Sequence, residues 1–367
     1  MATHTRTAAA VESLDVAAFT IPTDEPEQDG TFDWDSTTIV VCEVHAGGET
    51  GLGYTYGDVA TGKLIESALA EVVCGRDALE VGASWEAMSR ALRNIGRPGI
   101  GMMAISAVDV ALWDLKARLL DQPLVAILDA RHEAVPIYGS GGFTSYSLDR
   151  IREQLGGWVA EGIPRVKMKV GREPERDPQR LDAAREAIGT DTKLYVDANG
   201  ALSRKDALAW AWRFAEQWGV TWFEEPVSSD DLEGLGLLRE EGPPGLDIAA
   251  GEYGYVLPDF VRLAGVVDCL QADVTRCGGI TGLLQAGGVA AAREIDLSGH
   301  CAPAVSAHAF PAVPNLRHLE YFHDHVRVEA MLFDGVPEPD GGELRPDRSR
   351  PGLGLELKRA DAERYAA

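Results

Sequence analysis

The chain has 367 residues, of which 45% are hydrophobic and 25% are charged, a composition typical of globular proteins, and its length favours two domains over one. Its 34 basic and 58 acidic residues give a formal net charge of −24. So large a negative charge argues against nucleic acid and anionic membrane as partners.

The cysteines and the N-terminus predict a reducing compartment. The five cysteines are scattered along the chain without C-x-x-C spacing, which is typical of reduced cytoplasmic proteins. Residues 1–20 lack the charged start and the long apolar core of a signal peptide, and no apolar run is long enough to span a bilayer. We therefore expect a cytoplasmic location.

The N-terminal third predicts a small domain of mixed structure. Residues 11–21 and 37–46 predict strands, and within the second stretch residues 37–44 are β-branched and apolar. The acidic stretch 23–36 and the glycine-rich stretch 51–57 are too polar or too rich in glycine for core strands, so we expect surface loops there. Three further stretches have the pattern of amphipathic helices: residues 64–73, 85–94 and 103–120.

Short apolar runs alternate with helical patterns over the next part of the chain. Five of these runs end in or beside charged residues: 166–170, 194–200, 222–226, 248–252 and 269–273. Each run has the length of a buried strand, and strands that alternate with helices form a parallel sheet. The charged ends follow one another at intervals of 21 to 28 residues, the spacing that a closed (β/α)8 barrel requires.

The strand ends of such a barrel meet at one mouth, where the active site lies. Asp197, Glu224 and Glu252 would then form a ring of three carboxylates from successive strands, a donor set that suits Mg²⁺. The alternative is that these acids cap the following helices or pair with surface lysines. We favour the metal because all three acids stand at predicted strand ends that follow one another with the same spacing.

Two lysines precede this ring. Lys167 and Lys169 are two residues apart on a strand, so both side chains point into the barrel. Burying two ammonium groups side by side is costly, and both repulsion and desolvation lower a lysine pKa. We therefore expect Lys169 to be a usable base near neutral pH, the alternative being a pair neutralised by neighbouring acids.

Four motifs carry a resemblance to a known family: Lys167-x-Lys169, Asp197-x-Asn199, Glu224-Glu225-Pro226 and Gly251-Glu252. In this order and spacing they resemble the enolase superfamily, specifically its mandelate racemase group, over nearly the whole chain. The resemblance implies an α/β fold, a modified (β/α)8 TIM-type barrel with an N-terminal α+β capping domain. It places the capping domain with its lid loops at residues 1–130, the catalytic barrel at 131–325, and a segment returning to the capping domain at 326–367.

The resemblance also implies roles for the side chains at the barrel mouth. The three carboxylates would bind one Mg²⁺ per active site. The catalytic residues would be Lys169, His300, Asp273, Lys167, Glu320 and Asn199. The partner would be a small-molecule carboxylate, and homo-oligomers are usual in the family.

The second acid/base is assigned from strand ends. Asp273 ends one strand and His300 ends the next, and a carboxylate behind an imidazole fixes its tautomer and raises its basicity. His308 competes, but it falls in the expected helix after the strand, so we favour His300. Glu320 matches the family's glutamic acid on the last strand. Kept protonated, it would donate to a developing oxyanion, with a surface salt bridge as the alternative. The role of Arg276 stays open.

Two bases facing each other across a carboxylate substrate permit two reactions. Both begin with removal of the proton α to the carboxylate, through an enediolate intermediate. The resemblance favours the first, dehydration of an acid sugar to a 2-keto-3-deoxy acid, and the second is racemisation or epimerisation of a 2-hydroxy carboxylate. A non-catalytic binding protein on the same scaffold is the third possibility. The acids within residues 23–36 would repel a second carboxylate, so we expect a monoacid sugar, although a substrate bearing an ammonium group is also compatible.

Overall fold

The computed structural model describes residues 9–367, so the first eight residues of the predicted capping domain lie outside the described part. The N-terminal part is an antiparallel sheet in the order β1-β2-β3 that packs against the long helix α4. Its strands are β1 (Ser13–Gln28), β2 (Asp33–Ala46) and β3 (Glu49–Tyr56). Its helices are α1 (Val59–Leu64), η1 (Ile65–Leu69), α2 (Ala70–Val73), α3 (Val81–Ala91), η2 (Leu92–Asn94), α4 (Ile100–Leu119) and α5 (Leu124–Ile127).

Both stretches expected to be loops are strands, so that expectation was wrong. The glycine-rich stretch forms β3 because its glycines allow close contact with α4. A Cβ atom on Gly51 would lie 2.1 Å from the carbonyl oxygen of Ala111, and one on Gly53 would lie 2.2 Å from that of Ala107. The absence of side chains here is therefore a packing requirement.

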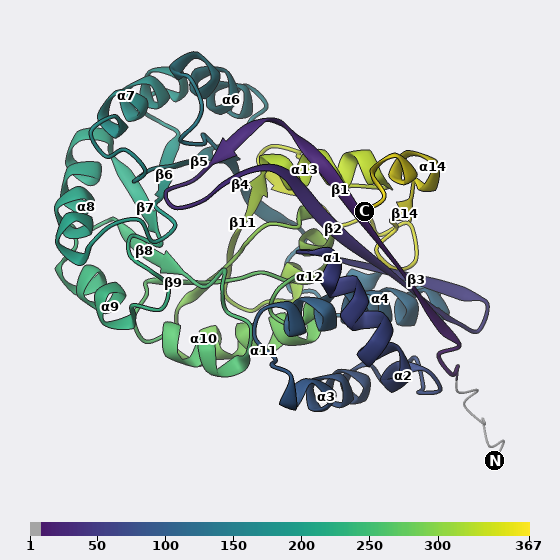
Figure 1. Cartoon of the computed structure of the whole chain (residues 1–367). Coiled ribbons are helices and arrows are strands. Elements are labelled where there is room, and N and C mark those ends of the chain that lie inside the picture. Colours follow the sequence, from purple (N-terminus) through teal and green to yellow (C-terminus); the bar gives the residue numbers. More distant parts are fainter. Residues whose placement is uncertain (1–8) are drawn as a thin grey trace.

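The acidic stretch 23–36 extends strands β1 and β2 into a hairpin. The pairing of β1 with β2 begins at Ser13 and continues to Gln28, which pairs with Asp33, with one register shift between Pro22 and Glu27. Figure 1 shows this hairpin running from the capping helices across to the barrel strands. It is polar because it projects beyond the body of the capping sheet and meets the polar mouth of the barrel.

The second part of the chain is a closed parallel barrel, as predicted. Strands β4 to β11 follow one another in order, and β11 pairs with β4 to close the ring. The strands are β4 (Val135–Gly141), β5 (Arg165–Lys169), β6 (Lys193–Asp197), β7 (Val220–Glu224), β8 (Asp247–Ala250), β9 (Cys269–Ala272), β10 (Asp296–Gly299) and β11 (Leu316–Phe322). The outer helices are α6 (Leu148–Ala160), α7 (Asp177–Ile188), α8 (Arg204–Trp218), α9 (Leu232–Glu241), α10 (Leu257–Leu263), α11 (Gly279–Ala292), α12 (Pro303–Ala309), η3 (Phe310–Ala312) and α13 (His323–Leu332).

An aromatic layer fills the barrel interior beneath the mouth. Tyr138, Tyr195, Trp222 and His318 come from four strands, and their ring centroids lie 4.8 to 6.5 Å apart. The ammonium of Lys167 lies 5.5 Å from the Tyr138 ring centroid, directly above this layer. The barrel is therefore packed at its centre, and its open space lies at the C-terminal ends of the strands.

The C-terminal residues contact the N-terminal sheet. Ala366 pairs with Phe19, and Arg359 forms an ion pair with Glu43 at 2.6 Å. The elements of this segment are β12 (Phe333–Asp334), β13 (Glu343–Leu344), β14 (Glu356–Leu357), α14 (Arg359–Ala362) and η4 (Glu363–Tyr365). Across residues 9–367, no helix has both the length and the apolar character needed to cross a membrane.

Candidate active site

Three carboxylates converge at the mouth of the barrel. Asp197 ends β6, Glu224 ends β7, and Glu252 follows β8. All three side chains are buried, and one oxygen from each lies within 4.8 Å of the others. A buried cluster of carboxylate oxygens is the hard donor set that Mg²⁺ prefers, so these residues fit the predicted ion. The three residues predicted as metal ligands are thus brought together.

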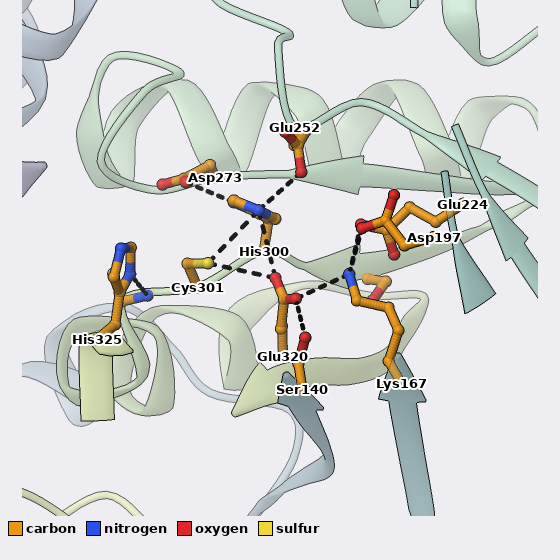
Figure 2. A network of polar contacts seen from close by, with 12 residues as sticks. Ser140, Lys167, Asp197, Glu224, Glu252, Asp273, His300, Cys301, Glu320 and His325 are labelled. Atoms are coloured by element: carbon orange, nitrogen blue, oxygen red, sulfur yellow. Dashed lines mark hydrogen bonds and ion pairs between the residues drawn. The ribbon is translucent and has the colours of Figure 1, made fainter. Parts of the chain in front are cut away.

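The two lysines lie among these carboxylates. Lys167 Nζ is 2.6 Å from Glu224 Oε1, 2.8 Å from Glu320 Oε1 and 3.0 Å from Asp197 Oδ2, as Figure 2 shows in part. Lys169 Nζ donates to Asp197 Oδ2 at 2.7 Å. Burial disfavours both ammonium groups, but the carboxylates outweigh it and raise the pKa of each lysine. The expected fall in the Lys169 pKa was therefore wrong, because the neighbouring protein carboxylates, Asp197 above all, raise this pKa instead.

His300 and Asp273 form a dyad beside the carboxylate cluster. His300 Nδ1 lies 2.7 Å from Asp273 Oδ2, while the other oxygen of Asp273 accepts from the backbone N–H and hydroxyl of Thr275, each at 2.7 Å. The second ring nitrogen, Nε2, is 2.8 Å from Glu252 Oε2 and faces the cluster (Figure 2). His308 lies instead on α12, where burial lowers its pKa to about 4.

Glu320 and Asn199 complete the predicted set. Glu320 Oε1 accepts from Ser140 Oγ at 2.6 Å and lies beside Lys167. Burial raises the pKa of Glu320, but Lys167 and His300 outweigh it, so the pKa is lowered and the side chain is ionised rather than protonated as expected. Asn199 has a φ of 45°, and its buried side-chain oxygen has no hydrogen-bond partner. That oxygen is available to a substrate.

A cavity of about 340 Å³ lies between the hairpin and the barrel mouth. It contains Lys169, Asn199, Glu252 and His300, and its remaining walls are mainly aromatic or hydroxyl-bearing. These walls include Phe32, Trp34, Ser36, Thr37, Thr38, Tyr56, Tyr253 and Phe322. A larger cavity of 560 Å³ beside Pro98 has no lysine or histidine in its lining and none of the predicted catalytic residues. Of these two cavities, the smaller one is therefore the candidate active site, because it contains Lys169, Asn199 and His300.

The tip of the hairpin is held against the barrel by several hydrogen bonds. Thr144 Oγ1 donates to the backbone oxygens of Gln28 and Asp29, each at 3.0 Å, and Thr31 Oγ1 donates to the backbone oxygen of Asn199 at 3.3 Å. Gly30 packs so closely that a Cβ atom there would lie 2.1 Å from the Ala198 carbonyl oxygen. The hairpin therefore forms one wall of the cavity.

Two residues at the site could not be assigned a role from sequence. Arg276 Nη1 lies 3.5 Å from Glu252 Oε1, and its Nε lies 3.6 Å from Asp273 Oδ2, so it links the acids of two neighbouring strands. Cys301 follows His300, and its thiol lies 3.4 Å from His300 Nε2. Neither residue belongs to a motif with recognised spacing, and only the closed barrel brings them to the mouth.

The structure combines a closed parallel barrel, a capping sheet whose hairpin lies over the barrel mouth, and a buried triad of acids beside two lysines and a histidine. This combination defines a barrel enzyme. Family models match in both parts: residues 9–129 match the mandelate racemase / muconate lactonizing enzyme N-terminal domain, and residues 150–362 match the enolase C-terminal domain-like family. The chain belongs to the mandelate racemase / muconate lactonizing enzyme family of the enolase superfamily.

Relatives in this family include several enzymes of acid sugars. The chain is 34% identical to the 3,6-anhydro-alpha-L-galactonate cycloisomerase of Streptomyces coelicolor, over 85% of this chain and 87% of that protein. It is 33% identical to the L-talarate/galactarate dehydratase of Salmonella typhimurium, over 81% of this chain and 77% of that protein.

Solved structures agree with this assignment. A mandelate racemase/muconate lactonizing enzyme-like protein from Rubrobacter xylanophilus is 64% identical, with a TM-score of 0.97, over 98% of this chain and 100% of that chain. The Salmonella dehydratase, solved with Mg and L-lyxarohydroxamate, is 29% identical with a TM-score of 0.90, over 100% of this chain and 95% of that chain.

Proposed function

We propose that this protein binds Mg²⁺ and removes the proton α to the carboxylate of an acid sugar, which then loses a β-oxygen substituent to give a 2-keto-3-deoxy acid. The observation that carries the proposal is that Lys169 and His300 line one cavity from the ends of β5 and β10, on either side of the strands β6, β7 and β8 whose ends carry the acid triad. Two groups so placed can reach opposite faces of a substrate carbon.

We assign Asp197, Glu224 and Glu252 as the residues that hold the ion. When bound, Mg²⁺ supplies positive charge for the negative charge that develops on the substrate carboxylate. It would also engage the Asp197 carboxylate, whose charge raises the Lys169 pKa. Lys169 is then the base that accepts the α-proton at Nζ.

His300 is the partner acid in this scheme. Its Nδ1–H is held by Asp273, which fixes the ring so that Nε2 faces the cavity. Nε2 delivers a proton to the departing β-oxygen, which leaves as water when it is a hydroxyl. Lys167 and the side-chain amide N–H of Asn199 position the substrate carboxylate, and the ionised Glu320 holds Lys167 in place at 2.8 Å.

The outer cavity favours a substrate with a single carboxylate. Besides Lys169 and His300, its cationic or titratable nitrogen groups are Arg276 and His325. Arg276 is already within ion-pair distance of Glu252 and Asp273. His325 stacks on Tyr56 at 3.4 Å between ring centroids, and burial lowers its pKa to about 3, so it is neutral near pH 7. Among the described residues that line this cavity, no free cation remains to bind a second carboxylate.

The acidic hairpin contributes less to this selectivity than its composition suggests. Of the six acids at positions 24–35, only Asp29 lines the cavity, and its Oδ1 accepts from the backbone N–H groups of Thr31 and Phe32. Asp24 pairs with Arg150. Hydroxyl groups on Ser36, Thr37 and Thr38, which also line the cavity, suit the hydroxyls of a sugar chain.

Racemisation or epimerisation is the second candidate, because the same two groups could exchange one proton between faces without expelling an oxygen. A binding protein without catalysis is the third. A screen of monoacid and diacid sugars with Mg²⁺, monitored for 2-keto acid formation, tests the proposal. Turnover of a monoacid sugar supports it, turnover confined to diacids refutes the monoacid assignment, and C2 epimers without keto product favour the second candidate.

We also propose the domain division that the sequence suggested: residues 1–130 as the capping domain, 131–325 as the barrel and 326–367 as the returning segment. The contacts of Ala366 with Phe19 and of Arg359 with Glu43 support it.

A further inference from the structure

The backbone after β10 places two neighbouring side chains in one cavity. In an extended strand His300 and Cys301 would point to opposite faces. Cys301 instead has a φ of 51° and Ala302 a φ of 47°, so the strand ends in two consecutive left-handed residues that are not glycine. Such conformations are strained for residues other than glycine and cluster at functional sites. Both His300 and Cys301 line the cavity as a result.

Three potential ligand atoms from this turn and from β11 form a nearly equilateral triangle. Cys301 Sγ lies 3.4 Å from His300 Nε2 and 3.3 Å from Glu320 Oε2, and His300 Nε2 lies 3.3 Å from Glu320 Oε2. A tetrahedral Zn²⁺ with ordinary bond lengths to nitrogen, sulfur and oxygen would hold such atoms about 3.4–3.6 Å apart. The three atoms already have the separations of one face of a zinc tetrahedron.

The neighbours of these ligands are those that a zinc site needs. The N–H of the other ring nitrogen, Nδ1, donates to Asp273 Oδ2 at 2.7 Å, and zinc-bound histidines commonly have a carboxylate in this place. The second oxygen of Glu320 accepts from Ser140 at 2.6 Å, which leaves Oε2 facing the thiol. All three ligand residues are buried, and Figure 2 shows them converging on one point.

We propose that His300, Cys301 and Glu320 form a second divalent-cation site, selective for a thiophilic ion such as Zn²⁺, and that its occupancy removes His300 from proton transfer. Sulfur and nitrogen ligands select Zn²⁺ over Mg²⁺, whereas the all-oxygen triad of Asp197, Glu224 and Glu252 has the opposite preference. On binding, the thiol proton and the proton on His300 Nε2 both leave to solvent, the metal–sulfur bond forms, and the ion takes the lone pair that Nε2 then has free. The effect on catalysis rests on the proposed function, but the binding does not.

Cobalt tests the binding without an activity assay. Co²⁺ added to the full-length protein in excess Mg²⁺ should give a thiolate-to-cobalt charge-transfer absorption that saturates at one equivalent and is abolished by Zn²⁺. Cys301→Ser should remove the band. The matched control is Cys74→Ser, which replaces the exposed cysteine and should retain it. A folded wild-type protein without the band, or a band that survives Cys301→Ser and disappears in Cys74→Ser, overturns the site.

A second variant keeps the test decisive if Cys301→Ser does not fold. Asp273→Asn leaves all three ligands in place but weakens the support of His300, so cobalt affinity should fall about 10- to 100-fold with the band retained. Unchanged affinity would overturn the assignment of His300 as a ligand. Zn²⁺ should inhibit turnover at the concentrations that displace cobalt. Binding without inhibition would overturn the proposed effect on His300 while leaving the site in place, and a protein that turns over no acid sugar would bear on the proposed function alone.

Discussion

Replacing Gly30 by alanine should separate the hairpin from the barrel mouth. Gly30 lies at the hairpin tip, and a Cβ atom there would be 2.1 Å from the Ala198 carbonyl oxygen and 2.9 Å from the Ala201 Cβ atom. Both neighbours are backbone or Cβ atoms of the loop after β6, which cannot rotate away. Relief of the contact requires the tip to move by about 1.4 Å, since non-bonded atoms settle at about 3.5 Å.

That displacement should reduce activity far more than stability. The tip carries Asp29 and Phe32 into the cavity and bonds to the backbone of Asn199, so its movement disturbs substrate positioning. A misplacement of about 1 Å can lower turnover by about 100-fold, and we expect a loss in kcat/KM between about 10- and 100-fold. The assay is 2-keto acid formation from the acid sugar that the wild type accepts, with circular dichroism to verify folding.

The matched control is Gly82→Ala on α3, where the added Cβ would meet no atom within 4 Å. This variant should retain wild-type kcat/KM. A folded Gly30→Ala protein within twofold of wild type would refute the role of the hairpin as a wall of the active site.

Three further predictions concern metal binding and stability. Burial and Asp197 raise the pKa of Glu224 to about 7. Because a protonated carboxyl is a poor ligand, the affinity for Mg²⁺ should fall as the pH drops below 7. Titration calorimetry at pH 6 and pH 8 measures this, and equal affinities would contradict the prediction. Gly53→Ala should destabilise the protein by about 1–3 kcal/mol in urea unfolding, because its Cβ would press on α4; an unchanged midpoint would contradict the packing. Burial raises the pKa of Glu329 from 4.5 to about 8, so the stability that its protonated form contributes is present below pH 4.5 and is lost as pH rises through 8. Between pH 5 and pH 8 the wild type should therefore lose more stability than Glu329→Gln. Equal losses in the two proteins would contradict this prediction.

The barrel could be predicted because its signal is local and periodic. Apolar runs that end in charge recur at a fixed interval, and each run is long enough to be a strand. The capping sheet could be predicted only in part. Gly51 and Gly53 resemble loop residues because sequence does not show that the α4 backbone lies against them. The hairpin at residues 23–36 is polar because its neighbours are the polar loops of the barrel mouth.

The site could be predicted as a set of residues but not as an electrostatic environment. Strand-end position was enough to bring Lys167, Asp197 and His300 to one mouth. The protonation states depend on distances between strands that only the closed barrel sets. Lys167 is surrounded by three carboxylates, which raise its pKa, and it in turn lowers the pKa of Glu320. The contact between the Cys301 thiol and His300 could not be predicted, because it depends on a left-handed backbone turn that no spacing pattern in the sequence encodes.

The most direct test of the proposed chemistry is proton NMR in D₂O with Mg²⁺ and a panel of monoacid sugars, comparing wild type with His300→Asn. The wild type should convert one sugar to a 2-keto-3-deoxy acid. The variant should lose product formation yet still exchange the α-proton of that sugar through Lys169. Loss of exchange together with product in a folded variant would contradict the assignment of Lys169 as the base. No exchange by the wild type with any acid sugar would contradict α-proton abstraction itself.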